Sequence, residues 1–228
     1  MDGNRGRRHV SRRTPVSKAL GRPRQVDSTE TRNTLLEVAR RIFARDGYGA
    51  TTNRSIAEEA GITTGAIYHY FPSKAELFAA VYDQVQNIVY DRFEVALSKP
   101  GSLIERFSSA LDAAVELNRS DSSLAGFVVT VPTEVQRHAE LVDLLAPIRS
   151  RSTVFITQLV ADAVANDEFA AGVEPAAVED LLSVVMSGLA VFSTVTGDRD
   201  RHSAAVGAPH RFLVGDLLRR PGHPPRNG

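Results

Sequence analysis

The sequence contains no cysteine, so disulfide bonds, thiol nucleophiles and zinc sites with cysteine ligands are excluded. No apolar run approaches the roughly 18 residues that cross a bilayer, and we expect no membrane partner. The basic N-terminus is not followed by an apolar segment of roughly 7 to 15 residues, so no secretory signal is expected. These absences predict a cytoplasmic protein.

The sequence motifs of common catalytic sites are also missing. There is no Gly-x-x-x-x-Gly-Lys-Ser/Thr phosphate loop, no Gly-x-Gly-x-x-Gly fingerprint and no Gly-x-Ser-x-Gly elbow. The 6 histidines never occur as His-x-x-x-His, the spacing that places two imidazoles on one helix face. We therefore expect no catalytic residue, no cofactor and no metal site, and no enzymatic activity.

Strands are not predicted, because no segment alternates apolar and polar residues with a period of two. Apolar residues recur at helical spacing, and Ser, Thr, Pro and Gly stand where helices begin and end. The predicted fold class is all-α. Pro147 indicates that the helix containing it starts late or kinks, and Pro209 leaves the start of the last helix open between 203 and 208. The expected helices span about 27–46, 51–60, 63–71, 73–98, 102–119, 122–135, 140–166, 175–196 and 203–220.

The formal net charge of zero hides an uneven distribution along the chain. Residues 1–75 hold 14 Lys and Arg against 7 Asp and Glu, a balance of +7, and residues 76–228 hold 13 against 20, a balance of −7. Residues 1–26 carry eight basic side chains and few large apolar ones, which predicts a disordered basic arm. A basic N-terminal third on an acidic remainder favours nucleic acid as a partner.

The segment Thr52–Phe71 has the pattern of a helix-turn-helix. Ala57 is small where two helices must approach, and Gly61 provides the positive φ of a tight turn. Ile62 would fill the turn, and Ile67 would anchor the second helix of the motif to the rest. The outer face of that helix is then free to meet a DNA groove: Thr64, Gly65, Ala66, Tyr68, His69 and Tyr70.

Beyond this pattern, the chain resembles the TetR family of bacterial transcriptional regulators from about Thr31 to Asp83. The matching segments are Leu35–Gly47, Tyr48–Thr52, Ser55–Ala57, Ala60–Thr63 and Ala66–Lys74. The resemblance implies a three-helix DNA-binding domain over 27–75 and a helical ligand-binding and dimerisation domain over 76–220. The composition of residues 221–228, rich in Pro, Gly, Arg and Asn, predicts a tail. The resemblance also implies a homodimer that binds a palindromic double-stranded DNA operator and is released by a small-molecule effector.

The resemblance assigns DNA-binding roles residue by residue. Thr64, Gly65 and Ala66 fall on base-reading positions, and Tyr68, His69, Tyr70 and Lys74 fall on positions that contact phosphate, with a base as an alternative for His69. Thr52 and Arg54 fall on backbone-contacting positions, and Thr63 opens the reading helix. Each has a simpler explanation as well: packed core tyrosines, a solvated His69 or Lys74, and a Thr52 that only caps its helix.

Within the arm, Gly21-Arg22-Pro23-Arg24 resembles the core of an AT-hook. This resemblance implies that Arg22 and Arg24 lie in the minor groove of A·T-rich DNA, where proline keeps the strand extended. A basic tail that binds any polyanion weakly, or none, is the alternative.

The C-terminal helices offer candidates for a ligand pocket and for a dimer interface. Large apolar residues spread over several helices could line an apolar pocket or form plain core: Phe93, Phe107, Phe127, Phe155 and Met186. Helix 175–196 is apolar on more than one face, which favours burial against a second subunit over a central core position in a monomer. The interface residues predicted there and on the last helix are Val185, Leu189, Phe192, Phe212, Leu213 and Leu217.

The sequence therefore predicts a homodimeric transcriptional repressor with an unidentified, apolar effector. Two alternatives stay open: an architectural DNA-binding protein without a ligand, and an enzyme built on a helical scaffold. The missing catalytic motifs weigh against the second.

Overall fold

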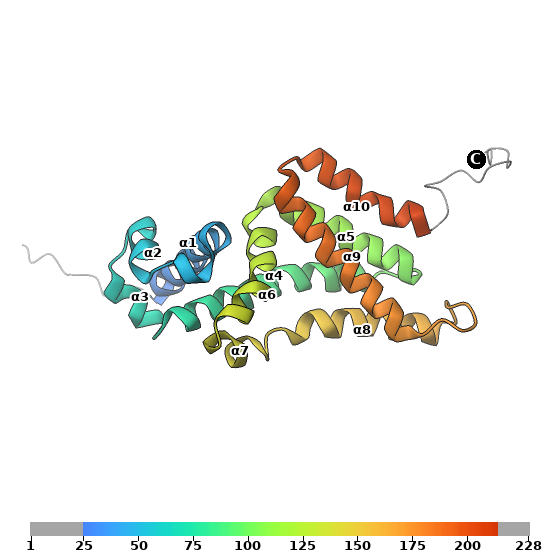
Figure 1. Ribbon diagram of the computed structural model, residues 1–228, viewed down its shortest axis with the longest axis horizontal. Coiled ribbons are helices and arrows are strands. Elements are labelled where there is room, and N and C mark those ends of the chain that lie inside the picture. The colour runs from blue at the N-terminus through green and yellow to red at the C-terminus, as the bar shows by residue number, and fades with distance from the viewer. Residues whose placement is uncertain (1–24, 214–228) are drawn as a thin grey trace, which may run out of the picture.

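The computed structural model describes residues 25–213, which form ten helices and no strand (Figure 1). The predicted all-α class is confirmed. The helices are α1 (Gln25–Ala50), α2 (Asn53–Ala60), α3 (Thr64–Tyr70), α4 (Lys74–Leu97), α5 (Leu103–Ser120), α6 (Ser123–Arg137), α7 (Glu140–Leu145), α8 (Ser150–Ala165), α9 (Pro175–Thr196) and α10 (Arg199–Leu213).

The helix ends in the N-terminal part lie where local sequence predicts them. Gly47 has a φ of 76° and breaks the helical path of α1, and Gly61 has a φ of 67° after α2. The side chains of Thr52, Thr63 and Ser73 accept hydrogen bonds from the first turns of α2, α3 and α4. The predicted helix-turn-helix is therefore present in the fold.

Two predicted helix starts are wrong, and the interruption expected at Pro147 is present. The expected helix 140–166 is two helices, α7 and α8, which are separated around Pro147. Leu141 and Leu145 of α7 belong to one core and Phe155 of α8 to another, so the break lets each helix face its own core. α10 begins at Arg199 rather than 203, and α1 begins at Gln25, inside the predicted arm. Residues 1–24 and 214–228, including the predicted tail, lie outside the described part.

Two hydrophobic cores lie along the molecule, and α4 contributes to both (Figure 1). The first joins α1–α4 to α6 and α7, and its aromatic centre is Phe43, Phe78 and Phe127, with centroids 4.9 Å apart between Phe78 and each of the other two. The second lies among α4, α5, α8, α9 and α10. The predicted domain boundary at 75/76 falls inside the first core, where α1 packs directly on α6.

Helix α9 is unusually apolar for its position on the surface. Its best 18-residue window has a mean hydropathy of 1.6, enough by length and composition to cross a membrane, and 6% of that window is buried. This corrects the expectation that no stretch approaches a membrane span. Length and composition alone do not distinguish a membrane helix from a helix that another protein surface covers.

Candidate DNA interface and ligand cavity

Helix α3 presents its predicted contact residues outward. Ile67 is fully buried and holds the helix against the first core, while the next residue, Tyr68, is 53% exposed. Gly65 and His69 are exposed, and Thr64, Ala66 and Tyr70 are half-buried. The Tyr70 hydroxyl lies 3.4 Å from Ser28 Oγ at the start of α1. Tyr68 is thus not a core aromatic, and the outer face of α3 is open to a groove.

The two threonines at the helix starts have internal hydrogen bonds. Thr52 Oγ1 accepts from Ser55 N at 3.0 Å, and Thr63 Oγ1 accepts from Ala66 N at 3.2 Å. Both are exposed, so the caps position α2 and α3 without closing these residues off from DNA. Arg54 pairs with Glu58 one turn further along α2, with both side chains mostly exposed.

Lys74 has a role that the sequence did not predict. Its ammonium donates to the carbonyl oxygens of Tyr48 at 2.7 Å and Thr51 at 2.9 Å, and lies 4.1 Å from the centre of the Tyr48 ring. Burial lowers the pKa of Lys74, while the carboxylates of Glu140 and Glu134 act in the opposite direction. Lys74 is therefore not a freely solvated side chain at the start of α4. It ties α4 to the segment between α1 and α2.

The same segment contacts the C-terminal half of the molecule through Tyr48. Its hydroxyl donates to Glu140 Oε1 at 3.2 Å, and its ring meets the His138 ring edge-on at 4.8 Å. Burial raises the pKa of Tyr48 to about 12, and the Glu140 carboxylate adds to this effect. Glu134 passes so close to Gly47 that an added Cβ would lie 2.6 Å from its Oε1, and the φ of 76° also favours glycine there. We name this group, Tyr48, Lys74, Glu134, His138 and Glu140, the junction cluster.

A second polar link joins α1 to the start of α6. Arg40 is 4% exposed and forms an ion pair with Asp121, and its Nε donates to Ser123 Oγ at 3.0 Å. Burial alone would raise the pKa of Asp121, but hydrogen bonds from Ser123 and the charge of Arg40 outweigh it and lower the pKa. A buried arginine needs such partners, so the pair sets how α1 lies on α6.

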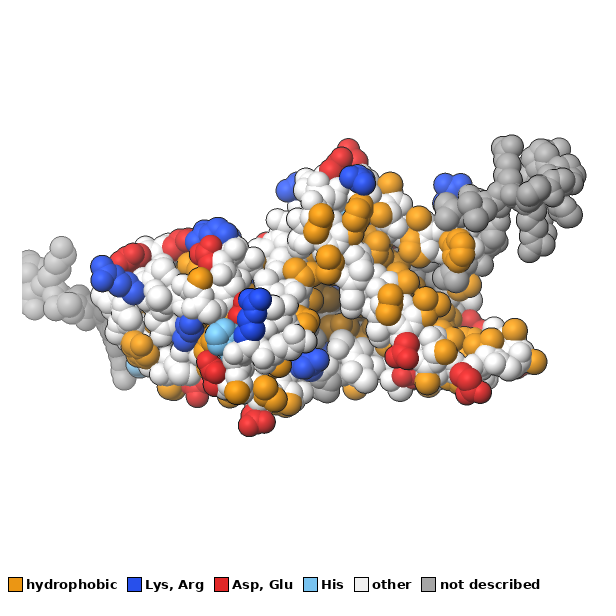
Figure 2. All heavy atoms as spheres, in the orientation of Figure 1, with side chains coloured by type: hydrophobic (Ala, Val, Ile, Leu, Met, Phe, Trp, Pro, Cys, Tyr) orange, Lys and Arg blue, Asp and Glu red, His pale blue; other side chains and the backbone are white. Residues whose placement is uncertain are grey.

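A cavity of about 170 Å³ lies among α4, α5, α6, α9 and α10. Figure 2 shows the surface hollowed in the middle of this face, with orange side chains around the opening. Most of the lining is apolar, including Phe93 and Met186, two of the predicted pocket residues. The polar residues in the lining are Gln86, Tyr90, Asn118, Ser187, Ser193 and His202.

The other three predicted pocket residues belong to the cores. Phe127 is fully buried in the first core, and Phe107 and Phe155 are buried in the second. Their side chains pack between helices and do not line the cavity, because ring-sized residues fill the close helix crossings. The polar lining residues were missed, because a lone Gln, Asn or His on a helix gives no sequence signal of a pocket.

The outer face of α9 is a continuous apolar stripe. Leu181, Val184, Val191 and Val195 are between 48% and 76% exposed, and nothing lies within 4 Å of a Cβ placed on Gly188. Together with Gly188, they are spaced alternately three and four residues apart, which keeps them on one face of a helix. Figure 2 shows orange side chains along this helix.

Two of the predicted interface residues on α9 lie on a different side of the helix from this stripe. Val185 and Leu189 pack against the second core, and Leu189 also lines the cavity, so both face the protomer's own interior. Phe192 is half-buried with the Arg201 guanidinium 5.4 Å from its ring centre, and Phe212 is 61% exposed. Leu217, the Leu213 side chain, Arg22 and Arg24 lie outside what the structure describes.

The N-terminal helices are similar in sequence to known bacterial regulatory proteins. The sequence model described as "Bacterial regulatory proteins, tetR family" matches residues 35–81, which include all of α2 and α3. The HTH-type transcriptional regulator UidR of Escherichia coli is 24% identical over 85% of this chain and 96% of its own length. The HTH-type transcriptional repressor KstR2 of Mycolicibacterium smegmatis is 34% identical over 37% of this chain and 42% of its own length.

Solved structures share the whole fold. The transcriptional regulator FadR from Bacillus subtilis, solved in complex with stearoyl-CoA, superposes with a TM-score of 0.70 at 16% identity over 82% of this chain and 99% of its own. GusR from Salmonella enterica superposes with a TM-score of 0.61 at 22% identity over 89% of this chain and 98% of its own. The likeness therefore extends from the helix-turn-helix through the C-terminal helices.

Proposed function

We propose that the chain is a DNA-binding transcriptional regulator of the TetR family, a homodimeric repressor that a small apolar molecule releases from an inverted-repeat operator. It acts in the cytoplasm, where its DNA lies, and it is a regulator rather than an enzyme. Repression is the sign of regulation that the name of KstR2 carries.

The observation that carries DNA recognition is the pair of neighbours Ile67 and Tyr68. One is fully buried and the other is 53% exposed, so α3 is held rigidly by one face and offers the other. The short side chains of Thr64, Gly65 and Ala66 allow this face to approach base edges closely. Two such helices related by a dimer axis would read half-sites whose centres lie about one helical turn, or a multiple of it, apart.

The dimer rests on the outer stripe of α9. A water-soluble monomer would leave four large apolar residues and an open glycine exposed along one helix. Packing this helix against its copy buries the stripe on both subunits at once, as an isologous interface requires. The dimer axis then also aligns two copies of α3.

The effector acts through α6, which has two faces. Leu124, Ala125 and Val128 line the cavity, and Leu124 also belongs, with Phe127 and Val131, to the first core beside α1. A molecule that fills the cavity therefore presses on the same helix that supports the DNA-binding head. A shift of α6 would reach α1 through the Arg40–Asp121 pair and the junction cluster.

The test is to isolate the genomic DNA that the purified protein retains and to search it for a shared inverted repeat. Fluorescence anisotropy then compares that repeat with a scrambled duplex of the same composition. We expect binding at least a hundredfold tighter to the repeat. Equal affinity for both duplexes would contradict the proposal and favour the architectural alternative.

A further inference from the structure

One residue that lines the cavity has a buried side-chain oxygen without a hydrogen-bond partner. The Gln86 side chain on α4 lines the cavity, the residue is 4% exposed, and its Oε1 has no hydrogen-bond partner. Burying an amide oxygen without a partner costs stability, so such atoms are rare and point to a missing ligand or water. This oxygen is one of the few exceptions in the described part of the chain.

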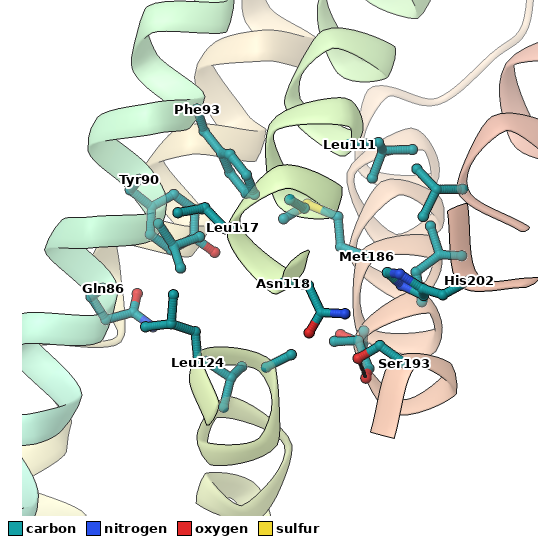
Figure 3. A pocket seen from close by; sticks show the side chains of 18 residues that line it. Gln86, Tyr90, Phe93, Leu111, Leu117, Asn118, Leu124, Met186, Ser193 and His202 are labelled. Atoms are coloured by element: carbon teal, nitrogen blue, oxygen red, sulfur yellow. Dashed lines mark hydrogen bonds between the residues drawn. The ribbon is translucent and has the colours of Figure 1, made fainter. Parts of the chain in front are cut away.

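The polar groups lie on two sides of the cavity. In Figure 3, Gln86 and Tyr90 extend from α4 on one side, and Asn118, Ser193 and His202 gather on the other. Ser193 already donates to the Ala190 carbonyl at 2.7 Å. Phe93, Leu111, Leu117 and Met186 complete a largely apolar wall around them. The Gln86 amide is thus a polar point beside an apolar space.

The described lining offers no permanently charged side chain to pair with an ionic ligand. It holds no Lys, Arg, Asp or Glu, and burial raises the pKa of Tyr90 to about 12, so its hydroxyl stays neutral near pH 7. Carboxylates and phosphates need charged or multiple donors when they leave water. The volume of about 170 Å³ is close to the roughly 150 Å³ of cavities that accept one benzene ring.

We propose that the effector is a neutral molecule of about one ring in size, with an apolar body and a hydroxyl group that donates to Gln86 Oε1. This inference rests on the proposed function, because it names the chemistry of the effector in that regulator. A hydroxyl can donate and accept, so it pairs with the Gln86 amide in either orientation of its oxygen and nitrogen. Gln86 is therefore the residue that distinguishes a hydroxylated ring from a purely hydrocarbon one.

The experiment compares 4-methylphenol with 1,4-dimethylbenzene, which have the same shape and differ by hydroxyl against methyl. Isothermal titration calorimetry on the full-length protein gives the Kd of each probe. We expect 4-methylphenol to bind about tenfold more tightly, since the hydrocarbon leaves Oε1 unpaired. Gln86→Leu should abolish this preference, and Gln86→Met serves as a second variant if the leucine protein does not fold.

Gln84→Leu is the matched control. Gln84 lies two residues earlier on α4 and its Oε1 is also buried without a partner, but it does not line the cavity. This variant should keep the tenfold preference. Equal Kd values for the two probes on the parent protein, or no binding of either, would overturn the proposal, as would a preference that survives in Gln86→Leu.

The same preparations are assayed for binding to the operator repeat. A protein that binds the repeat but neither probe overturns the effector chemistry and leaves the regulator in place. A protein that prefers 4-methylphenol through Gln86 but does not prefer the repeat supports the ligand site and contradicts the proposed function.

Discussion

The Lys74 ammonium lies over the Tyr48 ring, 4.1 Å from its centre, and donates to the carbonyl oxygen of the same residue at 2.7 Å. Tyr48 in turn donates through its hydroxyl to Glu140 on α7. Tyr48 therefore connects the start of α4, the segment before α2 and the C-terminal helices. When these helices move relative to one another, the contacts of Tyr48 with Lys74 and Glu140 either move with them or break.

Lys74→Met keeps the apolar stem and removes the charge. We expect it to lower stability by about 1–2 kcal/mol, or about 3–6 °C in Tm, because two carbonyl groups lose a charged donor. Differential scanning calorimetry measures the shift, and the exposed Lys99→Met is the control. The opposite outcome is an unchanged Tm together with a slope of log K against log salt that is smaller by about two units per dimer. That result would show that Lys74 contacts DNA phosphates instead.

Substitutions on α3 should separate affinity from specificity. Tyr68→Ala should weaken binding to the operator and to unrelated DNA by a similar factor of about ten, because a phosphate contact is independent of sequence. Thr64→Ala should change the ratio of the affinity for the operator to the affinity for unrelated DNA. Neither should shift the Tm of the free protein by more than a degree or two, since Tyr68 is exposed and Thr64 is only half-buried. Anisotropy titrations would refute the groove assignment if Tyr68→Ala bound both duplexes like the parent.

The dimer prediction uses the outer stripe of α9. Val184→Glu with Val191→Glu should place unpaired carboxylates in an apolar interface at a cost of several kcal/mol and raise the dimer Kd more than a hundredfold. The variant should stay helical and lose most operator binding. Val95→Glu on α4, which is 62% exposed, is the control for an added charge. Light scattering decides, and a double variant that remains dimeric would place the interface elsewhere.

The arm outside the described residues carries a prediction from sequence alone. Residues 1–24 hold eight basic groups and one acidic one. If two or three arginines per arm contact DNA, a dimer makes about four to six extra phosphate contacts, and log K against log salt steepens by about 4 to 5 units. Deletion of 1–24 should flatten the slope by that amount.

Operators with A·T-rich and G·C-rich flanks then test the role of Arg22 and Arg24. Minor-groove insertion predicts a larger loss of affinity with A·T-rich flanks. Equal losses would leave an electrostatic tail, and an unchanged slope would mean that the arm does not touch DNA.

Acid should release the link between α1 and α6. The pKa of Asp121 is lowered in the fold from its ordinary 3.8, so the ionised form is the one that stabilises the protein. This stabilisation is complete above about pH 5 and is lost as the pH falls through the ordinary and then the lowered pKa. The Tm difference between the parent and Asp121→Asn should therefore shrink between pH 5 and pH 2.5. The exposed Asp112→Asn should follow the parent throughout, and a difference that grows with acid would contradict the assignment.

Local sequence determined much of the N-terminal part of this protein. The caps at Thr52, Thr63 and Ser73 and the left-handed Gly47 and Gly61 depend on residues within one turn, so they could be predicted without the fold. The buried Ile67 and the exposed Tyr68 follow from the helical period within the same short motif. The interruption at Pro147 could also be predicted from the sequence. That the two resulting helices face different cores could not.

Only the tertiary structure decided the rest, because it depends on residues far apart in the chain. The carbonyl oxygens that Lys74 binds belong to residues 23 and 26 positions away, so the local sequence around Lys74 does not predict these hydrogen bonds. Helix α9 is apolar on more than one face, and its neighbours turn Val185 and Leu189 inward and leave Val184 and Val191 outside. The cavity is the space that the side chains of five helices leave unfilled. Gln86 is proposed as a binding group because no neighbouring residue forms a hydrogen bond with its side-chain oxygen.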